Sequence, residues 1–417
     1  MVQHQPRTLT RVVRDLIADE LARLRHVDPA LIARELKNDH RLGPDGFGMD
    51  SFEFMTVSAA FARMFHIYDL GAEDYLLARP TVDAWCDLVM ELAMSDSGDT
   101  ASGPAHLITF LSSGSTGERT AAEHSRQLLV EEMQVFRKLL GTPARMFVTV
   151  PAHHIYGYLF SVLLPDIMSE SAAPEIVELR GAALSRPPAA YTRSGSAAPT
   201  AGDMIIAFPD ALARLHAAGT IPRDGLTIVT STAPCPPELA RHIRSGGARL
   251  VEVYGSSETA GIGFRDSDDT PYTLLPYWDT RGDGLIRPTP GATEYHEVRP
   301  PDELSWWDDD RHFLPLRRRD GAVVVGGRNV YPDRVADAIR ALDGVHDVAV
   351  RLHEAAGGSR LKAFVVADAD APDTEQLESR IRASLARTLT AAEQPAVYTF
   401  GPVLPRNTMG KLSDWLV

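Results

Sequence analysis

Several features that mark particular classes of protein are missing from this 417-residue sequence. It has only two cysteines, Cys86 and Cys235, which provide neither a disulfide framework nor the ligand spacing of a zinc site. Such sparing use of cysteine is typical of a reducing compartment, so we expect a cytoplasmic protein. No apolar run approaches the roughly 18 residues of a membrane helix, and the N-terminus lacks the apolar segment of a signal peptide. We therefore expect no membrane partner.

Positive charge is also in short supply. The 42 lysines and arginines are outnumbered by 56 aspartates and glutamates, which gives a formal net charge of −14. Non-specific nucleic-acid binding needs a basic face, so we expect no nucleic-acid partner, although this does not exclude local binding of a nucleotide. With 44% hydrophobic and 24% charged residues, the chain has the composition of a globular protein, and its length suggests about two to four domains.

The sequence divides at the small, polar segment Ser95–Pro104, SDSGDTASGP, which is typical of a linker. Residues 1–94 carry apolar side chains at helical spacing and are predicted to form an all-helical domain. Its helices are expected at Thr8–Leu24, from Asp50 to about Phe65, and at Val82–Met94.

After the linker, strands and helices alternate, which predicts a layered α/β domain over residues 105–319. Gly181–Gly202 is rich in proline, serine and glycine and is expected to be a mobile excursion. The first strands are expected at His106–Leu111, Met146–Val150, Ala201–Phe208 and Leu226–Val229.

Residues 320–417 have the pattern of a small α+β domain. Its strands are expected at Ala322–Val325, Val345–Leu352, Leu361–Val366 and Ala396–Phe400, and its helices at Pro332–Leu342 and Glu375–Leu389. The predicted fold class is thus multidomain: a helical bundle, then a layered α/β domain, then a small α+β domain.

The first chemical motif is the loop Phe110–Gly117, FLSSGSTG, which follows a predicted strand. Its glycines let the backbone approach a ligand closely, and its hydroxyl groups add donors, so the loop is suited to a polyphosphate. It is not a Walker loop, because no Gly-Lys-Ser/Thr follows. Taken alone, an ordinary flexible connection is an equally good interpretation.

Two further motifs strengthen the nucleotide hypothesis. Val253–Glu258, VYGSSE, again follows a strand, and it combines an aromatic ring able to stack on adenine with a carboxylate able to hold Mg²⁺. Leu404–Leu412, LPRNTMGKL, offers Lys411 next to a glycine, although a single lysine is most often just solvated. The three motifs in this order are far more specific than any one of them.

These residues resemble the acyl-adenylate-forming superfamily, which includes acyl- and aryl-CoA ligases, nonribosomal-peptide adenylation domains and luciferases. The resemblance runs from about Ala105 to the C-terminus. It implies that residues 105–319 are the adenylation core and residues 320–417 a mobile C-terminal lid. The matching motifs are SSGSTGE at Ser112–Glu118, PAHHIYG at Pro151–Gly157, YGSSET at Tyr254–Thr259, GGRNVYP at Gly326–Pro332 and LPRNTMGK at Leu404–Lys411.

The resemblance implies roles for individual residues in binding ATP. The β- and γ-phosphates are held by the phosphate loop at Ser113, Gly114, Ser115, Thr116 and Gly117. Tyr254 stacks on the adenine, Ser257 binds the α-phosphate, and Glu258 coordinates Mg²⁺. Arg318 contacts the ribose, for which Asp302 is the candidate acidic partner.

The same resemblance implies a two-step reaction. Lys411 bridges the attacking carboxylate and the α-phosphate, and its charge, with that of Mg²⁺, offsets the charge of the transition state. The lid then rotates about a hinge at Asp320 before a thiol takes the acyl group. The chain departs from the family in two respects: Arg119 and Thr120 stand where Pro and Lys are usual, and roughly a hundred residues are missing before the phosphate loop.

Leu9–Met94 resembles an acyl carrier protein, in which the serine of an Asp-Ser pair bears 4′-phosphopantetheine. That serine is Ser51 in the segment GMDSF, followed by Phe52 instead of the usual leucine. A simpler interpretation of the same residues is a helix start, with Asp50 as cap and Glu53 completing a capping box. If Ser51 is modified, a pantetheinyl transferase is a partner.

The segment PAHHIYG lines the channel for the acyl group and the thiol in the family. The adjacent His153 and His154 suggest a metal, but no third ligand lies at a suitable spacing, so we expect none. Cys235 lacks an activating partner and is not predicted to be a nucleophile. The residues predicted to line the substrate pocket are His154, Thr232, Ala233, Gly255 and Ile262.

The function predicted is therefore that of an ATP- and Mg²⁺-dependent acid–thiol ligase, with coenzyme A as the acceptor. The chain resembles the short 4-coumarate–CoA ligases associated with photoactive yellow protein, which suggests an aromatic acid such as 4-coumarate or a hydroxybenzoate. Loading of Ser51 or of a separate carrier protein is an alternative. A non-catalytic carrier or scaffold is another, favoured by the missing phosphate-loop lysine and opposed by Glu258 and Lys411.

Overall fold

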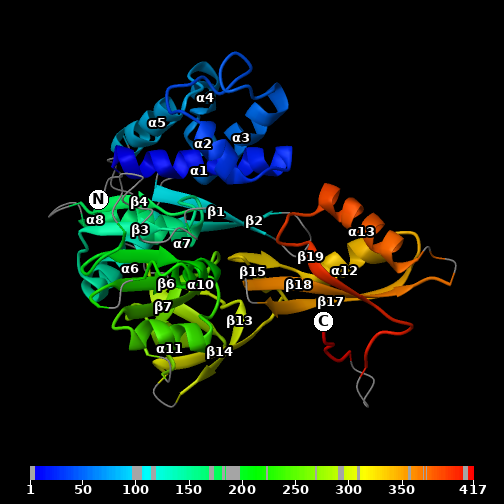
Figure 1. Ribbon diagram of the computed structural model, residues 1–417. Helices are drawn as coiled ribbons and strands as arrows, with labels where there is room; N and C mark the ends of the chain where they lie inside the picture. Colours follow the sequence, from blue (N-terminus) through cyan, green and yellow to red (C-terminus); the bar gives the residue numbers. More distant parts are fainter. Residues whose placement is uncertain are drawn as a thin grey trace. The chain divides into compact units, whose positions relative to one another are not determined.

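The protein is described from a computed structural model (Figure 1). Two compact units are present: a core unit of residues 1–112, 121–300 and 304–316, and a C-terminal unit of residues 113–120, 301–303 and 317–417. The structure describes residues 5–95, 106–113, 119–168, 173–180, 184, 198–221, 224–267, 270–289, 295–307, 310–355, 358–369, 371, 373–406 and 412–417.

The chain begins with a group of helices whose starts follow from local sequence. A proline stands in the first turn of α1 and of α2, where its missing N–H costs nothing. Asp50 caps α3 in a capping box with Glu53. The helices are α1 (Pro6–Arg25), α2 (Pro29–Glu35), α3 (Ser51–Met64), α4 (Glu73–Ala78) and α5 (Val82–Ser95), with a 3₁₀ turn, η1, at Tyr68–Leu70.

These N-terminal helices do not form a compact unit of their own. Their apolar side chains join one hydrophobic core with those of the strands and helices that follow, as Phe61 and Trp85 do with Phe110 and Phe136. Residues 1–94 and the adenylation core were expected to be separate domains, but the structure assigns them to the same unit. The physical reason is the helix α1, which buries polar as well as apolar residues against the core.

A nine-stranded sheet forms the centre of the core unit. Its strand order is β13-β14-β9-β8-β7-β6-β5-β3-β4. The strands from β4 to β7 are parallel, whereas β7, β8, β9 and β14 pair antiparallel. Their bounds are β3 (Arg145–Val148), β4 (Glu175–Glu178), β5 (Met204–Ala207), β6 (Thr227–Thr230), β7 (Arg249–Ser256), β8 (Ala260–Arg265), β9 (Tyr272–Leu274), β13 (Asp302–Trp306) and β14 (His312–Arg318).

Two smaller sheets complete the core unit. The strand β1 (Leu107–Ser113) pairs with β2 (Arg119–Ser125), and the phosphate loop connects them. The strands β10 (Asp279–Arg281), β11 (Gly284–Pro288) and β12 (Tyr295–Val298) form a three-stranded antiparallel sheet. The helices after the linker are α6 (Arg126–Leu140), α7 (Ile155–Tyr158), the π-helical segment η3 (Leu159–Leu163), α8 (Leu164–Met168), α10 (Pro209–Ala217) and α11 (Pro237–Ser245).

The strands expected in this region differ from the observed ones only at their ends. Each of the four predicted strands overlaps β1, β3, β5 or β6. Most of the expected excursion Gly181–Gly202 lies outside the described residues.

The C-terminal unit is a small sheet with two helices and its own hydrophobic core. Its hairpin β15–β16 turns at Gly326 and Gly327, which both have positive φ, as a two-residue turn of this kind requires. The elements are β15 (Val323–Val325), β16 (Arg328–Val330), α12 (Pro332–Arg340), β17 (Val345–Ala355), β18 (Gly358–Ala367), α13 (Thr374–Thr388) and β19 (Pro395–Phe400).

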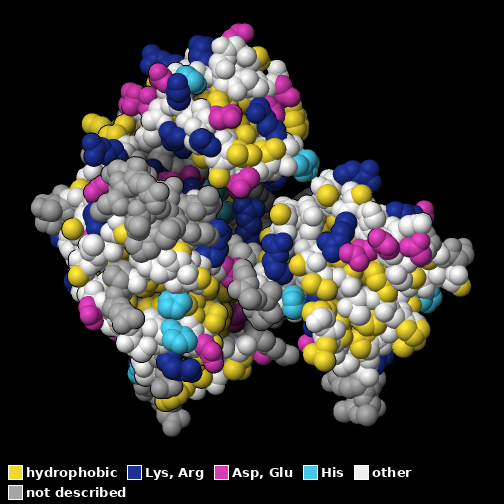
Figure 2. Space-filling model, in the orientation of Figure 1, with side chains coloured by type: hydrophobic (Ala, Val, Ile, Leu, Met, Phe, Trp, Pro, Cys, Tyr) yellow, Lys and Arg dark blue, Asp and Glu magenta, His cyan; other side chains and the backbone are white. Residues whose placement is uncertain are grey.

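Among the described residues, no helix combines the length and the apolar character that a membrane crossing requires. On the face of the molecule shown in Figure 2, acidic and basic side chains are interspersed over the N-terminal helices. Such a mixture agrees with the composition, in which 56 acidic residues accompany 42 lysines and arginines.

Candidate active site

Several predicted site residues lie at one edge of the large sheet. The strands β3, β5, β6 and β7 are parallel and adjacent, so the loops that follow them leave at the same edge. In open α/β sheets ligands bind beyond the carboxyl ends of the strands. The loop after β3 carries His154, the loop after β6 carries Thr232 and Ala233, and the end of β7 carries Tyr254 and Gly255.

The loop Pro151–Gly157 is tied to the neighbouring strands. The Tyr156 hydroxyl donates to the carbonyl of Val229, at 2.8 Å, and lies 3.1 Å from that of Ala207. Burial raises the pKa of Tyr156 well above its ordinary value, so the phenol stays protonated and is a donor. His154 is the residue before α7, with an extended backbone. The position of this loop is therefore set by the sheet.

The loop after β6 contains a backbone outlier. Thr232 has a φ of +80°, which is rare for a β-branched residue and is found where surrounding structure imposes it. Two contacts to β7 hold the loop: the Ser231 hydroxyl donates to the Val253 carbonyl at 2.8 Å, and the Cys235 N–H donates to Glu252 at 3.2 Å. Such strain clusters at ligand sites, so Thr232 stays a candidate for the pocket.

The motif Tyr254–Thr259 forms a tight turn between β7 and β8. The Thr259 hydroxyl lies 3.1 Å from the Ser256 hydroxyl and accepts the Ser256 N–H at the same distance. A side chain at Gly255 would collide with the Ala260 carbonyl, so only glycine fits there. Gly255, Ser256 and Thr259 are therefore required by the turn itself, whatever the motif binds.

The ring of Tyr254 is braced from two sides. Its centroid is 5.4 Å from that of Phe313, in an edge-on arrangement, and 5.7 Å from that of Tyr272. Tyr254 itself is only half-buried. A fixed and partly exposed aromatic ring is suited to stacking on a nucleobase.

A histidine that the sequence analysis missed connects this turn to the phosphate-loop hairpin. His124 lies on β2, the strand that leaves the phosphate loop, and its Nε2 donates to the Ser257 carbonyl at 2.6 Å. Burial is the main reason that the pKa of His124 falls below its ordinary value, so the ring is neutral at pH 7. The neighbouring Glu258 is exposed and therefore accessible to a ligand.

A second missed residue, Glu132, lies beneath the turn. This fully buried carboxyl group of α6 accepts the Gly261 N–H at 3.0 and 3.2 Å. Burial raises its pKa to about 7 despite the opposing charge of Arg287. A glutamate on the apolar face of a helix, beside Leu129 and Met133, is the sequence signal by which it was recognisable.

Two predicted parts of the site lie outside the described residues. These are Gly114, Ser115, Thr116 and Gly117 of the phosphate loop, and Lys411. Their roles stay predictions. Ser113 is the last residue of β1. Arg406 and Leu412, which flank residues 407–411 in the sequence, form an antiparallel bridge.

In the C-terminal unit, the predicted ribose-binding residues are brought together with the predicted hinge. Arg318 donates to both carboxylate oxygens of Asp320, at 2.9 and 2.8 Å. Burial alone lowers the pKa of Arg318, but this pairing and the charge of Asp302 raise it above its ordinary value. Asp320 also accepts the Ala322 N–H, and Gly321 between them has a φ of +69°. The segment predicted to be the hinge is thus a local turn closed by this ion pair, and its role as a pivot stays a prediction.

Three further residues considered in the sequence are Ile262, Cys235 and Ser51. Ile262 is fully buried within the main core. Cys235 is buried, and burial raises the pKa of its thiol to about 12, which leaves no thiolate to act as a nucleophile. Ser51 is exposed in the first turn of α3, where Asp50 accepts the Glu53 N–H at 2.8 Å and Glu53 accepts the Asp50 N–H at 3.1 Å. The capping interpretation of this segment is thus confirmed.

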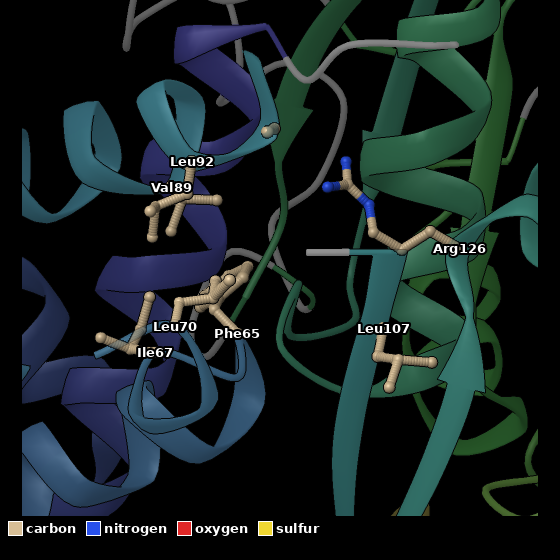
Figure 3. Close-up of a pocket in the computed structure, with 8 residues that line it drawn as sticks. Phe65, Ile67, Leu70, Val89, Leu92, Leu107 and Arg126 are labelled. Atoms are coloured by element: carbon tan, nitrogen blue, oxygen red, sulfur yellow. The ribbon is translucent and has the colours of Figure 1, made fainter. Parts of the chain in front are cut away.

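The pocket drawn in Figure 3 is not part of the candidate site. It lies between the N-terminal helices, which contribute Phe65, Leu70 and Val89, and the start of the following region, which contributes Leu107 and Arg126. None of the predicted site residues lines it.

The helix α1 is bonded to the loop that carries the histidines. Asp15 accepts two hydrogen bonds from Arg180, at 2.6 and 2.7 Å, and the Ala152 N–H at 2.7 Å. Burial raises the pKa of Asp15, but Arg180 outweighs it and keeps this pKa below its ordinary value. Arg11 donates to the Ser161 carbonyl of η3 at 2.6 Å. The N-terminal helices therefore support the candidate site directly.

Comparison with known proteins identifies the family. No family model matches the chain. The 4-coumarate–CoA ligase of Rhodobacter capsulatus is 36% identical over 388 residues, which cover 90% of this chain and 92% of the relative. The 4-coumarate–CoA ligase of Halorhodospira halophila is 32% identical over 409 residues, which cover 96% of this chain and 97% of that one. Most of residues 1–94 must lie within the second match.

A solved structure supports the fold. An amide bond synthetase from Marinactinospora thermotolerans has a TM-score of 0.58 to this chain, at 18% identity, and the superposition covers 97% of this chain and 92% of the other. At this identity the likeness concerns the fold alone. The two relatives above, at more than 30% identity over nearly their whole length, show more than the fold. The chain belongs to the family of the 4-coumarate–CoA ligases, which are AMP-forming acid–thiol ligases.

Proposed function

We propose that this protein activates an aromatic carboxylic acid of the 4-coumarate class with ATP and transfers the acyl group to coenzyme A. The observation that carries the proposal is the identity of 32% and 36% to two 4-coumarate–CoA ligases over almost the whole chain. The ordered turn Tyr254–Thr259 supports the nucleotide part, because it combines a braced ring, hydroxyl groups and an exposed carboxylate.

In the first step, a carboxylate oxygen of the acid attacks the α-phosphorus of ATP. The new bond joins acid and phosphorus, and the bond to the bridging oxygen breaks, so that pyrophosphate leaves. Tyr254 stacks on the adenine and Ser257 binds the α-phosphate. Glu258 would hold Mg²⁺, which supplies positive charge to the phosphate oxygens when bound. Lys411 supplies a second positive charge between the two negative reactants.

In the second step, the thiol of coenzyme A attacks the acyl carbon. A carbon–sulfur bond forms, the bond to the AMP oxygen breaks, and the thiol proton goes to solvent or to a nearby base. His154, Thr232, Ala233 and Gly255 line the pocket for the acid and the thiol. Asp320 and Gly321 provide the pivot on which the C-terminal unit turns between the steps.

Coenzyme A is a better acceptor than a pantetheine arm on Ser51. A carrier domain has to carry its arm between partners, whereas α1 is fixed to the core by the buried pair of Asp15 and Arg180. The Asp-Ser pair that suggested a carrier is accounted for by the capping box of α3. If Ser51 is nevertheless the acceptor, its replacement by alanine abolishes thioester formation and leaves adenylation intact.

The proposal is tested by exchange of pyrophosphate into ATP with a panel of aromatic and aliphatic acids. We expect exchange with 4-coumarate or a hydroxybenzoate, and a loss of at least about 100-fold in Lys411→Ala, because such charge stabilisation is worth several kcal/mol. Lys138→Ala, an exposed lysine of α6, is the matched control and should exchange normally. A preference for aliphatic acids would refute the aromatic substrate, and an unchanged Lys411→Ala would refute the assigned role of Lys411.

A further inference from the structure

Three side chains that can bind a metal meet where α1 contacts the loop after β3. One ligand atom each from Asp19, His153 and His154 lies within 4.8 Å of the other two. The Asp19 carboxylate is 3.6 Å from His153 Nε2, and the two imidazole rings have centroids 4.2 Å apart. No metal was expected for this histidine pair because no third ligand is near it in sequence. The structure provides one from a helix more than a hundred residues upstream.

The environment of His153 points to a missing ligand. The residue is only 7% exposed, and neither of its ring nitrogens has a hydrogen-bond partner among the described residues. Burying an unsatisfied polar group is unfavourable, and native proteins contain few such groups. A cation bound to Nε2 would give one of these two nitrogens a partner. The unpartnered nitrogens are thus a second observation, independent of the clustering.

The cluster is also held in place from both sides. Asp15, one helical turn before Asp19, is fixed by Arg180 and accepts the Ala152 N–H next to His153. The following His154 precedes α7, whose first turn is closed by the Tyr158 N–H donating to the His154 carbonyl at 2.7 Å. Ligands whose backbone is fixed in this way lose little freedom when an ion binds.

We propose that Asp19, His153 and His154 bind one divalent first-row transition metal ion of the zinc class. Two imidazoles and one carboxylate suit zinc and its neighbours, whereas Mg²⁺ and Ca²⁺ prefer all-oxygen ligands. With bonds of about 2.0–2.2 Å, two ligand atoms on a tetrahedral ion are roughly 3.4 Å apart, close to the 3.6 Å between Asp19 and His153. Three protein ligands leave the fourth position for water or a small molecule.

This site is distinct in chemistry from Mg²⁺ at Glu258, and no step proposed above uses it, so the inference goes beyond the proposed function. Its test is the metal content of the full chain, purified without a histidine tag and passed over a chelating resin. Mass spectrometry of the metals should find about one zinc-class ion per chain, because the three residues form one site. Asp19→Asn and His153→Gln should each lose most of it.

The matched control is His216→Gln. His216 and His242 form an exposed pair with ring centroids 6.0 Å apart, which is the kind of surface site that collects metal adventitiously. Metal that persists in Asp19→Asn and His153→Gln but disappears in His216→Gln would overturn the proposal. An ion that binds the folded state raises the Tm. The proposal would also be overturned if the wild-type chain contained no metal and its Tm did not rise when zinc chloride was added.

If the two ligand variants fail to fold, the wild type still decides the question. Co²⁺ added to the metal-free chain should give visible absorption bands of the intensity typical of a tetrahedral site, and zinc should abolish them by competition. The absence of such bands refutes the site. Metal content and Co²⁺ absorption do not depend on turnover. A failure of the metal proposal can therefore be distinguished from a failure of the proposed ligase activity.

Discussion

Two helices of the same N-terminal group, α1 and α3, relate to the rest of the molecule in different ways. α1 buries Asp15 and Asp19 against the core and bonds to Arg180 and Ala152. The first turn of α3 is exposed, with Phe52 70% accessible, and its polar residues mainly cap the helix. Resemblance to a carrier protein depends on the α3 turn, whereas α1 shows that these helices belong to the ligase. A short exposed motif is therefore weaker evidence of function than a buried long-range contact.

The largest loss of stability is expected on substitution of Asp15, which fixes α1 to the core. Asp15→Ala removes the buried carboxylate of Arg180, which keeps only the more exposed Glu178, and it removes the acceptor of the Ala152 N–H. Breaking a buried ion pair from one side costs about 3–5 kcal/mol. Thermal unfolding should show a large drop in Tm, and Asp15→Leu combined with Arg180→Met should recover part of it. An unchanged Tm in the single variant would mean that α1 is not fixed to the core.

Glu132 is also buried, but it has no bidentate arginine partner. Its pKa is therefore raised, whereas that of Asp15 is lowered. The pKa of Glu132 is raised to about 7, from an ordinary 4.5, so between these values the folded chain holds a proton that the unfolded chain has lost. Stability should therefore fall by about 2 kcal/mol between pH 5 and pH 8 and level off above.

Glu132→Gln mimics the protonated group and should lack this decline. The measurement is urea unfolding of both proteins, followed by tryptophan fluorescence at pH 5 and pH 8. Parallel pH dependence in the two proteins would show that Glu132 keeps an ordinary pKa.

The smallest effects are expected at the α3 turn. Asp50→Ala removes the cap and should cost about 1 kcal/mol, while Ser51→Ala should change the stability by less than about 0.5 kcal/mol, because no hydrogen bond of the capping box uses its hydroxyl. Tm values of the two variants give the comparison directly. A larger loss in Ser51→Ala than in Asp50→Ala would contradict the capping account.

Much of the fold is predictable because its signals are local. The capping box fixes the start of α3 at Ser51, and the pair Gly326–Gly327 gives the β15–β16 turn. The turn Tyr254–Thr259 is likewise recognisable, since its glycine and hydroxyl residues are required within six successive positions.

The contacts that complete the site are not predictable in this way. Asp15 meets Ala152 across 137 positions, and His124 meets the Ser257 carbonyl across 133, and no periodicity links such pairs. The approach of Asp19 to His153 is likewise a contact between residues far apart in the sequence. Ile262, predicted to line the pocket, lies on β8 and is fully buried, and its role in a pocket stays a prediction.

Our central proposal is that residues 1–94 are part of a coenzyme A ligase in which Ser51 carries no acyl group. The most direct test gives the Ser51→Ala variant ATP, Mg²⁺, 4-coumarate and free coenzyme A, and measures the acyl-CoA product by mass spectrometry. We predict product at a rate within about twofold of the wild type, because the proposed acceptor is free coenzyme A and no bond of the capping box uses the Ser51 hydroxyl. Normal pyrophosphate exchange without any acyl-CoA would contradict the account and make Ser51 the acceptor.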